Sequence, residues 1–213
     1  MKTWANRGRG EMMKAVKTFY SKAIDTFREF GGTEEELMWL VGSRLALFPS
    51  HREEIMLRLR AMEEIVRRAE GKILDVGSGS GLLALALSEK GIVTGVEKAP
   101  DFFPFLRTLE NERLKFIQGD FLRDDVGRDF DVVVFSYILH DLEPEPFLRR
   151  AIEVLARDGR IILGDFDLNM LRSKVRAFAD ENCLRIVEDV TLGRAKTHGS
   201  PCEAFLIVIE TGG

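Results

Sequence analysis

Residues 73–81 read Ile-Leu-Asp-Val-Gly-Ser-Gly-Ser-Gly, and this stretch decides the fold. The apolar run at 73–76 predicts a short strand that is buried on both faces. Three glycines then end the strand, and the run Leu-Leu-Ala-Leu-Ala-Leu at 82–87 predicts a helix. Glycines let a backbone turn tightly and approach a ligand with no Cβ in the way. A strand, a glycine turn and a helix in this order predict a site for an adenosine-containing cofactor.

The spacing of the glycines separates this turn from the dinucleotide fingerprint. That fingerprint reads Gly-x-Gly-x-x-Gly and places a pyrophosphate on the helix N-terminus. Here Gly81 comes one residue early, and Leu82 stands where the fingerprint needs glycine. With Asp75 just before the turn, the pattern resembles the first motif of the class I methyltransferases that use S-adenosylmethionine (SAM), in which no phosphate has to be held. The resemblance assigns five positions to the cofactor site: Asp75, Gly77, Ser78, Gly79 and Gly81.

An acidic residue follows at the distance expected for a ribose. The run at 92–97 predicts a second strand that ends in Glu97, 20 residues after Gly77. A carboxylate at this spacing accepts hydrogen bonds from the two ribose hydroxyls. NAD enzymes use the same arrangement, so Glu97 indicates adenosine binding without choosing the cofactor. We also assign the next residue, Lys98, to the cofactor site.

A third predicted strand, at 114–118, is followed by Gly119-Asp120-Phe121. In the methyltransferases that this chain resembles, an Asp at this point hydrogen-bonds the adenine amino group, and a neighbouring apolar side chain packs on the ring. The resemblance therefore implies these two roles for Asp120 and Phe121.

The end of the fourth predicted strand, at 130–135, carries the candidate catalytic residues. It is followed by Ser-Tyr-Ile-Leu-His-Asp-Leu at 136–142. Methyltransferases that act on exocyclic amines of bases often have an Asn/Asp/Ser-Pro-Pro-aromatic element here, and this chain keeps Ser136 and Tyr137 but has no prolines. The segment resembles more closely the Leu-His-Asp stretch of small-molecule methyltransferases, in some of which the His is the general base. We take Ser136, Tyr137 and His140 as candidate catalytic residues and place Ser136 at the cofactor as well. A structural role for His140 stays equally open.

The remaining pattern completes a single α/β domain. A helix is expected from 143, a turn at 157–160, a strand at 161–166, a helix at 168–182, and a hairpin of strands at 184–192 and 204–210. This order resembles the three-layer, Rossmann-like methyltransferase sheet, mostly parallel with an antiparallel last strand. We expect a SAM-binding domain at 71–213 behind an N-terminal helical extension at 1–70. Helices are expected at about 11–30 and beginning near 34 and 51, where capping boxes occur.

Composition favours a soluble enzyme in a reducing compartment. The 213 residues are 45% hydrophobic, which is enough to bury the core of one domain. No apolar stretch reaches the ~20 residues of a membrane span, and no signal-peptide hydrophobic region begins the chain. Three histidines and two cysteines show no metal-ligand spacing. Cys183 and Cys202 begin different strands of the predicted hairpin, so no disulfide is expected and the cytoplasm is the expected location.

The N-terminal segment is basic although the whole chain has a net charge of −4. Residues 1–28 hold seven Lys or Arg against two acidic residues. Together with nearby aromatic side chains, this arm could meet phosphates and stacked bases of RNA. Six of the seven are assigned to this contact: Lys2, Arg7, Arg9, Lys14, Lys17 and Lys22. A second basic element at 194–198 is expected in the hairpin loop. A solvated amphipathic helix explains the same charges equally well.

The sequence thus predicts a SAM-dependent methyltransferase, and we favour RNA as its acceptor, with a small molecule as the alternative. The basic arm favours methylation of a base nitrogen, such as an exocyclic amine, in RNA. The Leu-His-Asp segment and the acidic net charge favour O- or N-methylation of a small molecule with His140 as base. A third interpretation is a regulatory protein that binds an adenosine cofactor without catalysis.

Overall fold

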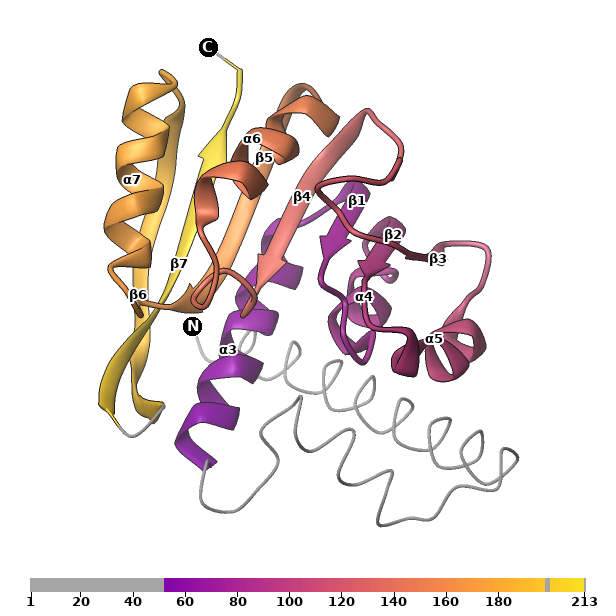
Figure 1. Ribbon diagram of the computed structural model, residues 1–213, viewed down its shortest axis with the longest axis horizontal. Coiled ribbons are helices and arrows are strands. Elements are labelled where there is room, and N and C mark those ends of the chain that lie inside the picture. Colours follow the sequence, from indigo (N-terminus) through magenta and orange to yellow (C-terminus); the bar gives the residue numbers. More distant parts are fainter. Residues whose placement is uncertain (1–51, 198–199, 213) are drawn as a thin grey trace, which may run out of the picture.

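The computed structural model describes residues 52–197 and 200–212 (Figure 1). The helices expected at about 11–30 and near 34, and the basic arm, lie outside these residues. In the described residues, the first helix is α3 (Arg52–Arg68), which agrees with a helix beginning near 51. The division into an extension at 1–70 and a domain at 71–213 stays a prediction.

Seven strands form one sheet in the order β3-β2-β1-β4-β5-β7-β6. β7 runs antiparallel to both neighbours, β5 and β6, whereas the five strands from β3 to β5 pair in parallel. This is the predicted Rossmann-like methyltransferase sheet with its antiparallel last strand. The strands are β1 (Gly71–Val76), β2 (Gly91–Glu97), β3 (Leu114–Gln118), β4 (Phe130–Ser136), β5 (Leu155–Phe166), β6 (Arg185–Thr197) and β7 (Ser200–Glu210).

Helices cover both faces of the sheet and give three layers. Besides α3, they are α4 (Leu82–Leu87), the short 3-10 helix η2 (Pro100–Phe102), α5 (Phe103–Leu109), α6 (Pro144–Val154) and α7 (Leu171–Glu181). Alternate strand residues face opposite layers: Ile73 packs in the core with α3, α4 and α5, and Leu74 packs in the core with α6 and α7. This alternation explains why the central strands are apolar on both faces.

Helix α3 packs directly on β5. A Cβ at Gly164 would lie 3.2 Å from Ile65 Cδ1 and 3.4 Å from Ala61 Cβ, so the helix and strand approach closely there. Ala61 and Ile65 are fully buried in the core that this face of the sheet shares with α4 and α5. The helix is therefore held firmly beside the carboxyl ends of β4 and β5. None of the helices between 52 and 212 is long and apolar enough to cross a membrane.

Two sequence predictions about strand limits were wrong. The segment 157–160 was expected as a turn but is part of β5, where the pairing with β4 shifts register between Phe130 and Val132. The turn-forming residues are thus accommodated as an irregularity within a strand. The basic residues 194–196 were expected in a hairpin loop but lie in β6, where Arg194 pairs with Glu203 and Lys196 with Pro201 across the ladder. Cross-strand hydrogen bonds extend the hairpin beyond its apolar part.

Candidate functional site

The glycine turn after β1 has a backbone that other residues would not adopt easily. Gly77, Gly79 and Gly81 all have positive φ, at 72°, 52° and 75°. A Cβ on Gly77 would lie 2.3 Å from Ile138 Cδ1, in the segment that follows β4. At Gly79 the nearest atom to such a Cβ is a backbone oxygen 3.9 Å away, so the outer side of the turn is open. The turn is thus packed on one side and free to receive a ligand on the other.

Glu97 lies directly against this turn. Its carboxylate accepts hydrogen bonds from the backbone N–H of Gly79 at 2.7 Å and of Ala99 at 2.8 Å. Each carboxylate oxygen can accept a further hydrogen bond. The structure therefore brings Glu97 to the glycine turn, as the spacing predicted, and its role with a ribose diol stays a prediction.

Asp75 is a buried carboxyl group at the same turn. Asp75 is 2% exposed, and its Oδ2 atom has no hydrogen-bond partner among residues 52–197 and 200–212. Burial raises the pKa of Asp75 to about 7; a hydrogen bond with Ser78 opposes this rise and the charge of Glu97 adds to it. A buried carboxylate oxygen without a partner fits a cationic ligand group. The ammonium group of the methionine part of SAM is such a group.

Asp120 and Lys98 meet at the neighbouring strand ends. Lys98 Nζ lies 3.0 Å from Asp120 Oδ2, and the backbone N–H of Leu122 donates to Asp120 Oδ1. The bond with Lys98 is the main reason that the pKa of Asp120 lies below its ordinary value. Phe121 is buried against the rings of Phe135 and Phe147, with centroid distances of 6.0 and 6.2 Å, so its ring belongs to the core. Leu122, 37% exposed, is the apolar side chain beside Asp120 that reaches the surface.

The segment after β4, where we expect the methyl acceptor to bind, has a strained backbone. Ser136 ends β4 opposite Gly164 of β5. Tyr137 has a φ of 55°, a conformation that is uncommon for a residue with a side chain, and its N–H donates to the oxygen of Gly164 at 2.9 Å. Its ring packs on Phe166 with a centroid distance of 4.8 Å. Strain of this kind is concentrated at functional sites.

His140 forms a buried pair with Asp165, the penultimate residue of β5. The two side chains are joined by a 2.7 Å contact between Nδ1 and Oδ1, and His140 is only 8% exposed. Asp165 is fully buried and also accepts hydrogen bonds from the N–H groups of Leu139 and Phe166, each at 2.8 Å. These bonds fix the carboxylate, which in turn orients the imidazole. When Nδ1 donates to Asp165, a neutral His140 carries its lone pair on Nε2.

The environment of His140 makes it a stronger base. Burial alone would lower the pKa of this imidazole, but the hydrogen bond and the charge of Asp165, with a smaller contribution from Asp141, raise the pKa above its ordinary value of 6.5. Sequence reasoning missed Asp165. The only signal for it is an acidic residue after four apolar or small residues at the end of a buried strand.

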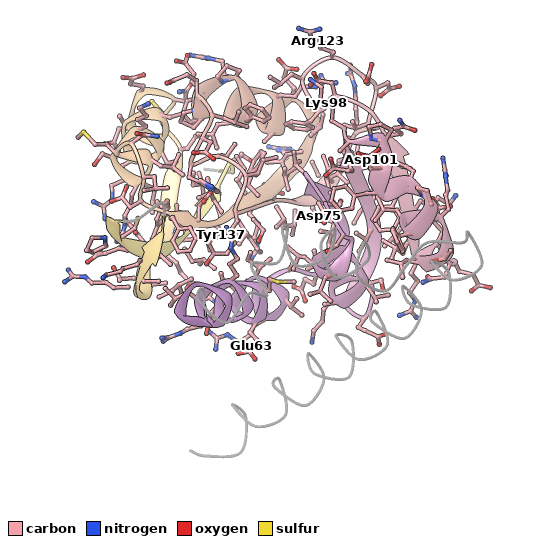
Figure 2. All side chains as sticks on the ribbon, turned by 60° about the horizontal axis from the view of Figure 1, so that its bottom comes forward. Glu63, Asp75, Lys98, Asp101, Arg123 and Tyr137 are labelled. Atoms are coloured by element: carbon pink, nitrogen blue, oxygen red, sulfur yellow. The ribbon has the colours of Figure 1, made fainter. Side chains whose placement is uncertain are left out.

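The cofactor residues and the candidate catalytic residues share one edge of the sheet. Figure 2 looks onto this edge, where the labelled Asp75 and Tyr137 lie at the ends of β1 and β4. The chain reverses its strand order between β1 and β4, and ligands of open α/β sheets bind in the crevice at this kind of point. Contact between Ile138 and Gly77 joins the two halves of the site.

Comparisons with known proteins agree with this geometry. Residues 74–163 match the family model described as a methyltransferase domain. The mitochondrial ubiquinone biosynthesis O-methyltransferase of Schizosaccharomyces pombe is 30% identical over 176 residues, which are 77% of this chain and 62% of that protein. The chain spans about half to three-fifths of the length of the curated relatives it matches first.

Two solved structures show the same fold at lower identity. The N-methyltransferase NodS from Bradyrhizobium japonicum, in complex with S-adenosylhomocysteine (SAH), is 21% identical with a TM-score of 0.60, and the match covers 78% of this chain and 90% of that one. The 1,6-didemethyltoxoflavin-N1-methyltransferase of Burkholderia thailandensis is 16% identical with a TM-score of 0.59, covering 85% and 92%.

The motif order and the seven-stranded sheet give the chain the fold of the class I SAM-dependent methyltransferases, and residues 74–163 match a methyltransferase domain. The cofactor is S-adenosylmethionine, and the residues of the site fit it. The open side of the glycine turn and the unpaired oxygen of Asp75 suit its methionine part, while Glu97 is placed to meet its ribose.

Removing the carboxylate of Glu97 should weaken cofactor binding. We expect Glu97→Ala to reduce the binding free energy of SAM and SAH by about 1–3 kcal/mol, as for other charge-assisted hydrogen bonds. Isothermal titration calorimetry measures this change. Glu89→Ala, at an exposed position after α4, is the matched control and should bind normally. Tight binding of NADH in place of SAM would contradict the assignment of the cofactor.

Cofactor affinity should rise with pH through about 7, where Asp75 ionises in the free protein. Only the ionised carboxylate pairs with the ammonium group, so binding at lower pH must release a proton. The folded protein keeps this proton up to about 7 whereas the unfolded chain loses it near 3.8, so the group costs stability increasingly as pH rises between these values. Asp75→Asn should remove both effects, which calorimetry and thermal unfolding at pH 5 to 8 measure. Equal SAH affinity across this range in the unaltered protein would contradict the assignment.

Proposed function

We propose that this chain is a methyltransferase that transfers the methyl group of SAM to a small organic molecule, with His140 as the general base. The pair of His140 and Asp165 carries the proposal, because a buried carboxylate that orients an imidazole is an arrangement suited to proton transfer. The similarity to a ubiquinone biosynthesis O-methyltransferase supports a small acceptor.

The chemistry divides between the cofactor and the chain. When bound, SAM supplies a methyl carbon that its sulfonium has already activated for attack. The protein has to align the acceptor with this carbon and take up the acceptor's proton. Nε2 of His140 accepts the proton, and Asp165 stabilises the imidazolium that results. Ser136 and Tyr137, at the end of β4, orient the acceptor.

Methylation of a base nitrogen in RNA, the acceptor that the sequence favoured, stays a prediction. Its main support, the basic arm within residues 1–28, lies outside the described residues. Arg194, from the second basic element, is paired with Glu203 at 2.5 Å across the β6–β7 hairpin, so part of that element serves the sheet. The relatives favour the small acceptor, and the His140–Asp165 pair favours catalysis over a purely regulatory role. A cytoplasmic location also stays a prediction.

Changes to the base should alter turnover but not cofactor binding. We expect His140→Ala to reduce turnover by about 10²–10⁴ and to leave SAH affinity unchanged. Asp165→Asn should lower the pKa of His140, because it removes the charge that raises this pKa. The acidic limb of the pH–rate profile should then move to lower pH. Steady-state kinetics from pH 5 to 9 measure this shift, and an unmoved limb with normal turnover in both variants would contradict the role of the pair.

Incubation with methyl-labelled SAM and separated RNA, protein and small-molecule extracts of the source organism tests the acceptor class. We expect label in the small-molecule fraction, with little dependence on salt. Label in RNA would support RNA as the acceptor if RNA affinity also depended on salt. The logarithm of the RNA-binding constant should then fall with the logarithm of the salt concentration, with a slope of about −0.7 per phosphate neutralised. In that case the combined change of Arg7, Arg9, Lys14 and Lys17 to alanine should flatten the slope.

A further inference from the structure

The segments that follow β4 and β5 are joined by two contacts beside His140. Asn169 Nδ2 donates a hydrogen bond to the backbone oxygen of His140 at 3.1 Å. Lys174 Nζ, in the first turn of α7, lies 3.1 Å from Glu143 Oε1. Residues 140–143 and 169–174 therefore lie side by side, just beyond the carboxyl ends of these two strands.

Two exposed apolar side chains belong to these bridged segments. Leu142 is 42% exposed and Met170 is 69% exposed, and we call this pair the apolar rim. Single exposed apolar residues are common on protein surfaces, but apolar residues gathered beside a functional site often bind a ligand. In the part of the chain that the structure describes, the other large apolar side chains that are exposed lie elsewhere: Ile92 in β2, Leu122 after β3 and Val190 in β6.

The backbone places Met170 on this rim at a cost. Asn169 and Met170 have φ angles of 51° and 59°, so two residues in succession take the left-handed conformation. Asn adopts this conformation readily because its short polar side chain can bond locally, whereas Met does so rarely. Glycine at position 170 would relieve the strain, and a polar residue would suit the exposure. Neither folding nor solubility therefore explains this methionine, and strained residues are concentrated at functional sites.

The proton-accepting end of His140 faces the same rim. Its Nε2 atom lies 3.5 Å from Oδ2 of Asp141, whose side chain is 63% exposed, and Leu142 follows directly. The opposite end of the imidazole, Nδ1, is turned inward to the buried Asp165. An acceptor held at Nε2 thus has the apolar rim as its neighbour. Any part of the acceptor that extends from there toward solvent can cover Leu142 and Met170.

We propose that the methyl acceptor carries an aliphatic chain, which lies across Leu142 and Met170 while the reacting group is at His140. The inference rests on the proposed function and adds the chemical class of the small molecule. Burial of apolar surface favours binding in proportion to the area removed from water. The unbranched side chain of Met170 also adapts its shape to a flexible aliphatic partner.

The test uses the full chain loaded with SAH and two homologous series of probes, with affinities measured by calorimetry. 4-Methylphenol, 4-butylphenol and 4-hexylphenol differ only in the length of the chain, and the corresponding 4-alkylanilines represent an acceptor nitrogen. Leu142→Gln combined with Met170→Gln makes the rim polar at similar size. Leu142→Met combined with Met170→Leu keeps it apolar. Ile92→Gln is the control, at an apolar residue 61% exposed in β2.

In at least one series, the affinity of the unaltered protein should rise about 2- to 4-fold for each added CH2 group, where the upper value corresponds to full burial. The double change to Gln should weaken binding of the hexyl probe about 5- to 20-fold and leave binding of the methyl probe and of SAH unchanged. The exchange of Leu142 and Met170 for Met and Leu should keep the dependence on chain length, as should Ile92→Gln. If the double Gln variant fails to bind SAH, each single change to Gln replaces it.

An affinity that does not rise with chain length, or that rises equally in the double Gln variant, overturns the inference. Failure of all the probes to bind overturns it too. Light scattering and sedimentation with phosphatidylcholine vesicles examine two other occupants of the rim, a second copy of the chain and a membrane. If the double Gln variant loses self-association or vesicle binding but binds the probes as before, the inference is also overturned.

Transfer of label from methyl-labelled SAM to the separated extracts keeps the two proposals apart. Label in the small-molecule fraction, without a dependence of probe affinity on Leu142 and Met170, overturns the inference alone. Absence of label from that fraction overturns the proposed function, and the inference with it.

Discussion

The left-handed turn at 77–81 is the constraint on which the rest of the site depends. Its backbone N–H groups at Gly77 and Ser78 donate to the oxygen of Val96, so the turn is tied to β2 just before Glu97. The N–H of Gly79 then reaches the Glu97 carboxylate. Because the turn is closed on its inner side by Ile138, it also fixes where the segment after β4 can run. One short element therefore positions both the cofactor residues and the loop that carries the candidate base.

The sheet divides the chemistry between its two halves. The ends of β1, β2 and β3 provide Asp75, Glu97 and Asp120, three carboxyl groups in different environments. Asp75 is buried and holds its proton up to about pH 7, whereas the hydrogen bond with the exposed Lys98 holds the pKa of Asp120 below its ordinary value. The ends of β4 and β5 provide the candidate base, His140, and the carboxylate of Asp165 that orients it. Burial of Asp75 costs stability, as is typical of groups whose pKa is perturbed at functional sites.

Sequence alone predicted the sheet, its antiparallel last strand and the position of Glu97 against the glycine turn, because local patterns and fixed spacings carry these features. It could not identify Asp165 or Asn169 as neighbours of His140. Asp165 meets His140 across 25 residues, and Asn169 meets it across 29. Such contacts depend on tertiary packing. The same reason explains Phe121, whose place after Asp120 suggested a contact with adenine but whose ring lies in the core.

A crystal structure of the complex with SAH tests the central claim most directly. The account predicts the methionine ammonium within hydrogen-bond distance of Asp75 and the ribose hydroxyls at Glu97. It also predicts that the sulfur faces the side of the site formed by Tyr137 and His140. SAH bound with its sulfur directed away from these two residues, or bound elsewhere than the glycine turn, would contradict the account.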